Sequence, residues 1–139
     1  MHGRTLLAAM AALALMTGAA HAAPAPASVY MEDLTMPELQ ARLAAGKPVA
    51  LIYSGGTEAT GPSVAYGKHS ARVHAYAGEI ARQLGDAIVT PVLPFAPNAD
   101  KLKGVGATLT LTTETFTAVN EQVARSLIAG GFKRVALLS

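Results

Sequence analysis

Two long segments of the chain carry apolar residues at the spacing of an amphipathic helix. In the first segment, residues three and four positions apart are apolar, namely Val73, Tyr76, Ala77, Ile80, Ala81 and Leu84. In the second segment, the same spacing relates Phe116, Val119, Val123 and Leu127. A helix with this pattern packs one face against a core. We therefore predict two helices, the first ending at Gly85 and the second, capped by Thr113, ending at Gly130.

A shorter helix is predicted by a capping motif nearer the start of the chain. Thr35 is a suitable N-cap residue, and Glu38, three residues later, completes a capping box. Pro37 fits the first turn of a helix, where its missing N–H group costs little. Gly46, followed closely by Pro48, predicts the end of this helix.

Short apolar runs separate the predicted helices. They occupy residues 49–53, 87–93 and 135–139, and residues 108–111 alternate in the manner of a short edge strand. Continuous apolar runs of this length are typical of strands buried on both faces, as in parallel sheets. The order of elements predicts an α/β fold with three layers, in which helices cover both faces of a mainly parallel sheet.

The first 22 residues have the three parts of a secretory signal peptide. Arg4 lies in the n-region, residues 6–16 form an apolar h-region, and Ala20 and Ala22 make a small-x-small cleavage site. The h-region is shorter than the roughly 20 residues of a membrane-spanning helix, so cleavage is favoured over an uncleaved anchor. We predict export to the periplasm or secretion, without stable membrane insertion after cleavage. An Ala/Pro linker at residues 23–29 would lead into one domain at residues 30–139.

The charge and the cysteine content exclude several functions. The chain has 11 Lys and Arg residues against 9 Asp and Glu residues, and the basic residues are scattered. Nucleic acid is not an expected partner, because binding it requires a basic cluster. The chain has no cysteine, which rules out disulfide bonds and thiol catalysis. The stability of an exported fold must then come from packing.

Residues 54–70, SGGTEATGPSVAYGKHS, combine an acid and an imidazole with a glycine-rich loop. They follow the strand predicted at residues 49–53, and loops at the carboxyl ends of parallel strands open onto the binding crevice. Glu58 and His69 offer an oxygen and a nitrogen donor, the ligand chemistry of zinc, manganese or iron(II). In the alternative interpretation, Glu58 complements the dipole of the following helix and His69 is a surface residue.

Other kinds of site match the same region less well. A phosphate cradle needs a G-x-G-x-x-G or P-loop pattern, and residues 55–61 match neither. Serine hydrolysis by a nucleophile elbow needs a G-x-S-x-G turn, which Ser54, Ser63 and Ser70 lack. His74 lies five residues after His69, does not share its helix face well, and is expected to be an exposed helix residue.

The ordered motifs of residues 30–139 resemble the N-terminal half of the creatininase (creatinine amidohydrolase) family. These motifs are Met31-Glu32-Asp33-Leu34-Thr35-x-Pro37-Glu38, Gly56-Thr57-Glu58-x-x-Gly61-Pro62 with Gly67 five residues on, GATLTL at residues 106–111, and Gly131-Phe132-Lys133-Arg134-Val135. The resemblance implies a creatininase-like α/β hydrolase that opens the C–N bond of a small amide or cyclic amide with a metal-activated water. It also implies a divalent metal ion, most simply zinc or manganese, and a homo-oligomer.

Carried over residue by residue, the resemblance assigns Glu58 to a metal-ligating glutamate and places His69 where the family has a bridging aspartate. Thr60 and Ser63 stand where the family has histidine ligands, with Gly61 between them, so these three residues are expected to form the substrate side of the loop. The chain thus offers two protein ligands, whereas a catalytic zinc ion needs three. The remaining ligands and catalytic groups are expected C-terminal to Ser139, in the second half of the family domain.

Two functions remain open at this point. The first is the N-terminal half of an exported, metal-dependent amidohydrolase. The second is a degenerate, non-catalytic binding or interaction domain on the same fold, and it is favoured by Thr60 and Ser63 in place of ligands.

Overall fold

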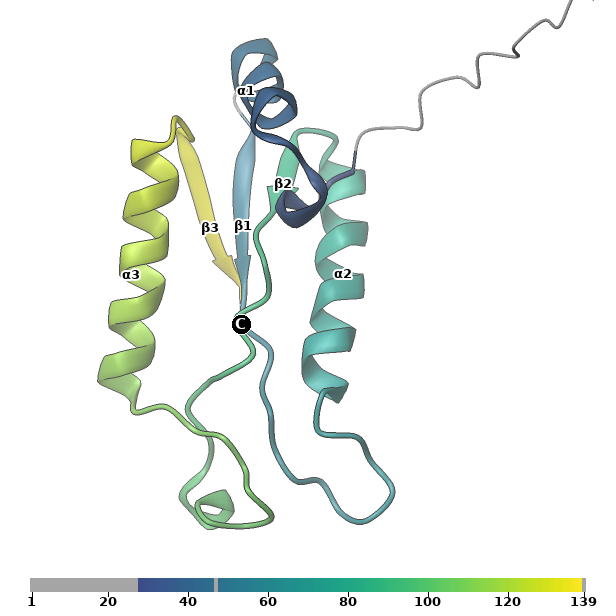
Figure 1. Ribbon diagram of the computed structural model, residues 1–139, viewed down its shortest axis with the longest axis vertical. Helices are drawn as coiled ribbons and strands as arrows, with labels where there is room; N and C mark the ends of the chain where they lie inside the picture. The colour runs from purple at the N-terminus through teal and green to yellow at the C-terminus, as the bar shows by residue number, and fades with distance from the viewer. Residues whose placement is uncertain (1–27, 47, 139) are drawn as a thin grey trace, which may run out of the picture.

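The computed structural model describes residues 28–46 and 48–138, which form three layers around a parallel sheet (Figure 1). The strands are β1 (Val49–Tyr53), β2 (Ala87–Val89) and β3 (Arg134–Leu138), in the order β2-β1-β3. The long helix α2 (Lys68–Leu84) covers one face of the sheet, and α1 (Met36–Ala45) and α3 (Thr113–Ala129) cover the other. This arrangement confirms the predicted fold class.

The described residues also include two short 3₁₀ helices, η1 (Met31–Asp33) and η2 (Asp100–Leu102). Within these ranges no helix is both long and apolar enough to cross a membrane. The predicted signal peptide, residues 1–22, lies outside the described residues, as does the predicted linker up to residue 27.

Strand β1 is the centre of the core. It pairs in parallel with β2 on one side and with β3 on the other. Leu51 and Tyr53 pack toward α2, whereas Ala50 and Ile52 pack toward α1 and α3. Burial on both faces explains why the sequence of β1 is continuously apolar rather than alternating.

The outer edge of β2 is covered by the segment that precedes α1. The backbone N–H of Val89 donates to the carbonyl oxygen of Val29 at 2.8 Å. Tyr30 lies against Gly78 of α2, where an added Cβ would come within 1.9 Å of the Tyr30 hydroxyl. Glycine at position 78 therefore leaves the space that this aromatic side chain occupies.

The ends of the helices follow the capping rules with one difference. The Thr35 backbone N–H donates to Glu38 Oε2 at 2.8 Å, as the predicted capping box requires. Helix α2 ends at Gly85, whose φ of 72° is in the left-handed region that glycine adopts without strain. The N-cap of α3 is Thr112 rather than Thr113, because the Thr112 hydroxyl accepts the Thr115 N–H at 3.2 Å.

Strand β2 is shorter than the apolar run at residues 87–93 that predicted it. Pairing with β1 stops at Val89, and Pro91, which has no N–H group, interrupts the ladder. Contact with the end of β1 resumes at Leu93, whose N–H donates to the Tyr53 carbonyl oxygen at 3.0 Å. Residues 108–111 form isolated bridges instead of the predicted edge strand.

The largest apolar side chains of α2 are more exposed than the helical pattern predicted. Ala77 and Ala81 are buried against the sheet and Val73 packs beside them, whereas Tyr76 is 61% exposed and Ile80 is 40% exposed. The small residues allow close approach of helix and sheet, and the larger ones lie beside this contact. On α3, Val123 is likewise exposed although its spacing predicted burial.

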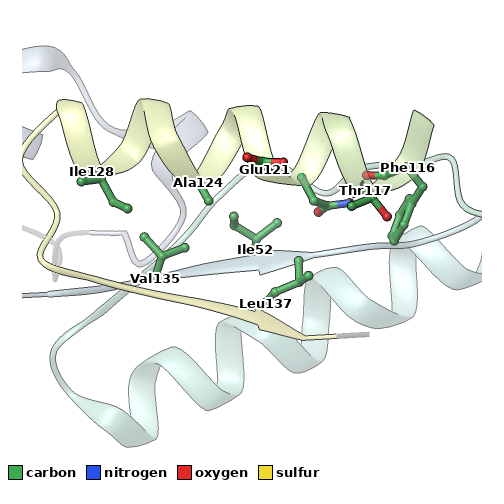
Figure 2. A pocket seen from close by; sticks show the side chains of 9 residues that line it. Ile52, Phe116, Thr117, Glu121, Ala124, Ile128, Val135 and Leu137 are labelled. Carbon is green, nitrogen blue, oxygen red and sulfur yellow. Dashed lines mark hydrogen bonds between the residues drawn. The ribbon is translucent and has the colours of Figure 1, made fainter. Parts of the chain in front are cut away.

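An apolar cavity of about 550 Å³ lies where α3 overhangs the edge strand β3. Figure 2 shows Ala124 and Ile128 on the helix above the cavity, and Val135 and Leu137 on the strand below it. In the part of the chain that the structure describes, no strand pairs with the outer edge of β3. An unpaired edge of this kind, with apolar surface beside it, favours association with another chain.

A leucine in the core and a leucine at the surface should differ in how much stability the protein loses when each is replaced by alanine. Leu51→Ala should lower the free energy of unfolding by about 2–5 kcal/mol, because it empties a fully packed site. Leu84→Ala at the exposed end of α2 should change it by no more than about 0.5 kcal/mol. Urea denaturation measures both. Equal losses in the two variants would contradict the position of the core.

The open edge of β3 predicts self-association that a charge can suppress. Leu137→Lys should reduce association at high protein concentration, because a charged side chain on an edge strand opposes strand pairing. Leu84→Lys, at a similarly exposed leucine on α2, is the matched control and should leave association unchanged. Sedimentation velocity measures the distribution of species, and equal effects of the two lysines would argue against β3 as the contact.

Candidate functional site

The loop between β1 and α2, residues 54–67, lies at the carboxyl end of the sheet, below the strands in Figure 1. It is tied to the segments that follow β2 on both sides of Glu58. The Thr57 hydroxyl donates to the Pro94 carbonyl oxygen at 3.0 Å, and the Ala59 N–H donates to the Thr108 hydroxyl at 3.0 Å. These flanking bonds fix the backbone at Glu58 within a glycine-rich loop.

Gly55 allows this loop to pass close to the first turn of α2. A Cβ at position 55 would lie 2.4 Å from Ser70 Oγ and 2.8 Å from Ser70 Cα. The second distance involves the helix backbone, which cannot move without displacing α2. The absence of a side chain at Gly55 is therefore a requirement of this geometry, which also brings the loop against His69.

The structure brings Glu58 and His69 together, which is the placement that the donor-pair interpretation of this loop required. His69 Nε2 lies 2.9 Å from Glu58 Oε1, and both side chains are partly buried. Lys68 adds an ammonium group 3.4 Å from the same carboxylate oxygen and 3.4 Å from the Glu58 carbonyl oxygen. The carboxylate is therefore shared between an imidazole and a lysine.

Arg72 contacts the other side of the His69 ring. Its Nη2 atom lies 2.9 Å from His69 Nδ1, one helical turn further along α2. Sequence reasoning did not include Lys68 or Arg72 in the site. The spacing of three residues between His69 and Arg72 was visible in the sequence, since such pairs are neighbours on a helix surface.

The contacts of Glu58 favour its ionised form. The hydrogen bond from His69 is the main influence that lowers the pKa of this carboxyl below its ordinary value of 4.5, and Lys68 lowers it further. Partial burial acts in the opposite direction, and the contacts outweigh it. At neutral pH, Glu58 is a carboxylate.

The three residues expected on the substrate side of the loop lie in its exposed outer part. The Thr60 hydroxyl lies 3.5 Å from Glu58 Oε1, at the outer limit of a hydrogen bond. Gly61 has a φ of 75°, a conformation that favours glycine. Ser63 is exposed. Thr60 thus neighbours the Glu58 carboxylate, and all three residues are exposed.

His74 belongs to a different contact of α2. Its ring stacks on Tyr30 with a centroid separation of 4.1 Å and an interplanar angle of 10°. The Tyr30 hydroxyl donates to the His74 carbonyl oxygen at 3.1 Å. His74 is therefore partly buried rather than an exposed helix residue, because an aromatic side chain from the preceding segment covers it.

The donor atoms of Glu58 and His69 suit zinc or manganese in kind but are insufficient in number. Two donors that lie about 2.1 Å from a tetrahedral zinc ion are about 3.4 Å apart. The observed 2.9 Å is instead an ordinary hydrogen-bond distance. Within the described residues, moreover, no three His, Cys, Asp or Glu side chains are placed to hold a metal ion. Lys68 and Arg72 also occupy positions beside the two donors. These residues do not form a metal site on their own.

A match to a protein-family model shows which family the chain belongs to. The family model described as Creatininase: Creatinine amidohydrolase matches residues 32–139. The chain belongs to the creatininase family. A comparison with curated proteins gave no match.

Solved creatininase structures share the fold and extend well beyond it. A mutant creatininase of the Zn-Zn type has a TM-score of 0.74 and 26% identity, over 81% of this chain and 45% of its own. A structure described as creatininase Mn has a TM-score of 0.73 and 26% identity, over 80% and 44%. A mutant complexed with creatine has a TM-score of 0.72 and 25% identity, over 80% and 44%. The chain thus spans less than half the length of these relatives.

The main contact of Glu58 predicts how its pKa will respond to mutation. His69→Leu removes the hydrogen bond that contributes most, so the pKa of Glu58 should rise toward 4.5. Carbon-13 NMR titration of the carboxyl group measures the change. Glu38 is the internal control, because Thr35 lowers its pKa independently of His69. A Glu58 pKa that stays unchanged would show that His69 is not its principal partner.

The same shift has a defined effect on stability. Because the folded-state pKa of Glu58 is lowered, its contribution is present above the ordinary value of 4.5 and is lost as the pH falls through the folded-state value. The His69→Leu variant should therefore lose less stability on acidification than the wild type.

Proposed function

We propose that this chain is the N-terminal part of an exported, metal-dependent amidohydrolase that opens a C–N bond in a small amide or cyclic amide. The observation that carries the proposal is the convergence of Glu58 Oε1 and His69 Nε2, 2.9 Å apart, at the carboxyl end of β1. Membership of the creatininase family and the solved relatives described with zinc, manganese and creatine support it.

In this proposal Glu58 and His69 supply two ligands of a divalent ion, zinc or manganese. Thr60, Gly61 and Ser63 form the substrate side of the loop. The other ligands and the catalytic groups come from the part of the family domain that lies beyond the 44% or 45% of the solved chains matched here. A divalent ion in such an enzyme activates water and polarises the carbonyl group. The described residues do not complete its ligand set, so no individual step is assigned to them.

A non-catalytic binding or interaction domain is the second candidate. It is favoured by the two cations beside the donor pair, Lys68 at 3.4 Å from Glu58 and Arg72 at 2.9 Å from His69. Hydroxyl groups at Thr60 and Ser63, which are weak ligands for a divalent ion, favour it as well. On this alternative the loop keeps its shape through charge pairing.

The protein expressed from its complete gene provides the test. It should hydrolyse creatinine or another member of a panel of small cyclic and linear amides, lose activity to a chelator, and regain it with zinc or manganese. Glu58→Gln should lower kcat/KM by at least about 100-fold, the upper end of the effect of residues that only orient metal ligands. Glu79→Gln, at an exposed glutamate of α2, is the matched control and should retain activity.

Two results would reject the enzyme proposal. One is hydrolysis that neither the chelator nor Glu58→Gln affects, since the reaction would then not use this loop. The other is a folded, zinc- or manganese-supplied protein that hydrolyses no member of the panel, which would favour the binding domain.

A further inference from the structure

His69 is held on both sides of its ring by groups that have opposite hydrogen-bonding requirements. Nδ1 faces the Arg72 guanidinium at 2.9 Å, and Nε2 faces the Glu58 carboxylate at 2.9 Å. We propose that Arg72 is a positioning residue that holds His69 in the tautomer unable to bind a metal ion through Nε2. Arg72 must then turn away before His69 becomes a ligand. This inference deepens the proposed function, on which its catalytic significance rests.

The contact with Arg72 determines which ring nitrogen carries the proton. A guanidinium group has five N–H donors and no acceptor, so Nδ1 must present its lone pair to Arg72. The single proton of a neutral imidazole is then on Nε2, where it donates to Glu58 Oε1 at 2.9 Å. A doubly protonated ring would instead direct an N–H group at the guanidinium and bring two positive charges together.

This tautomer is the wrong one for a metal ligand on the Glu58 side. A ligating nitrogen must offer a lone pair, and the lone pair of Nε2 is used by its proton. Moving the proton to Nδ1 would leave two donors, Nδ1–H and the guanidinium, facing each other. Histidine ligands usually donate their second N–H to a carboxylate, a carbonyl oxygen or water. Arg72, which faces Nδ1, is a hydrogen-bond donor and cannot accept that N–H.

Lys68 also opposes metal binding, because it lies beside Glu58, the other proposed ligand. Its ammonium group lies 3.4 Å from Glu58 Oε1, so it supplies positive charge next to the oxygen that an ion would use. Arg72 is exposed, however, and its side chain can turn into solvent without disturbing the core. Of the two cations, Arg72 is the one that controls the ring nitrogen, and it can be altered without removing a ligand.

Two substitutions at position 72 change the group that faces Nδ1, and one at position 82 controls for the change of charge. Arg72→Met removes the donor and keeps an unbranched side chain. Arg72→Glu replaces the donor with a carboxylate that accepts a hydrogen bond from Nδ1–H. Arg82→Glu makes the same change of charge elsewhere on the exposed surface of α2 and is the matched control.

The tautomer is measured by long-range ¹H–¹⁵N correlation NMR of the 139-residue protein, at a pH at which the imidazole is neutral. We expect the Nε2–H form of His69 in the wild type and in Arg82→Glu, and the Nδ1–H form in Arg72→Glu. Nδ1–H in the wild type, or Nε2–H in Arg72→Glu, would overturn the proposal.

Zinc affinity, measured by competition with a chromophoric chelator, provides the second readout. We expect Arg72→Glu to bind zinc about 10- to 100-fold more tightly than the wild type, the scale of effects from groups that contact metal ligands, with Arg72→Met between them. Arg82→Glu should match the wild type. No gain in the Arg72 variants, or an equal gain in Arg82→Glu, would overturn the proposal.

These measurements are independent of hydrolysis. If the expected tautomers and zinc affinities are found in a protein that hydrolyses no amide, the proposed enzyme function fails and the role of Arg72 stands. If hydrolysis depends on metal and on Glu58 while the Arg72 variants behave as the wild type, the proposed function stands and the role of Arg72 fails.

Discussion

The burial of β1 on both faces and along both edges is the constraint on which the described structure depends. Residues 50–53 are all buried; β3 pairs with β1 along its whole length, and β2 pairs with residues 49–51. A strand enclosed in this way has a fixed register, because a slip of one residue would exchange its two faces. The fixed register in turn determines where the loop of residues 54–67 begins. The position of Glu58 is therefore a consequence of packing in the core.

Much of the fold could be predicted because its local patterns agree with its packing. The run at residues 49–53 became a strand with the same bounds, and the capping box at Thr35 and Glu38 began a helix. The differences arose where two residues suited one role or where a proline intervened. Thr112 and Thr113 are both good caps, and only the hydrogen bond to Thr115 distinguishes them. Pro91 lies within an apolar run but cannot contribute to a ladder.

The candidate site was predictable as a pair of donors but not in its charge balance. A loop after a strand, followed by a helix, placed Glu58 and His69 at the same end of the sheet, and their approach was one of two interpretations left open. The direction of a long side chain is not determined by its position, so the sequence did not show that Lys68 would face Glu58. Nor could it show which ring nitrogen Arg72 would contact. That contact, rather than the residue type of His69, is the basis of the tautomer proposed for it.

Val29 and Tyr30 cover the outer edge of β2, so the two edges of the sheet differ. On that side, the Val89 N–H group already has a partner in Val29, and the Tyr30 ring fills the notch at Gly78. On the opposite side, no strand in residues 28–46 and 48–138 pairs with the outer edge of β3, and apolar surface lies next to it. Within the described residues, β3 is therefore the edge at which another strand can join the sheet most readily. A second copy that paired there would place the two edges side by side and cover both.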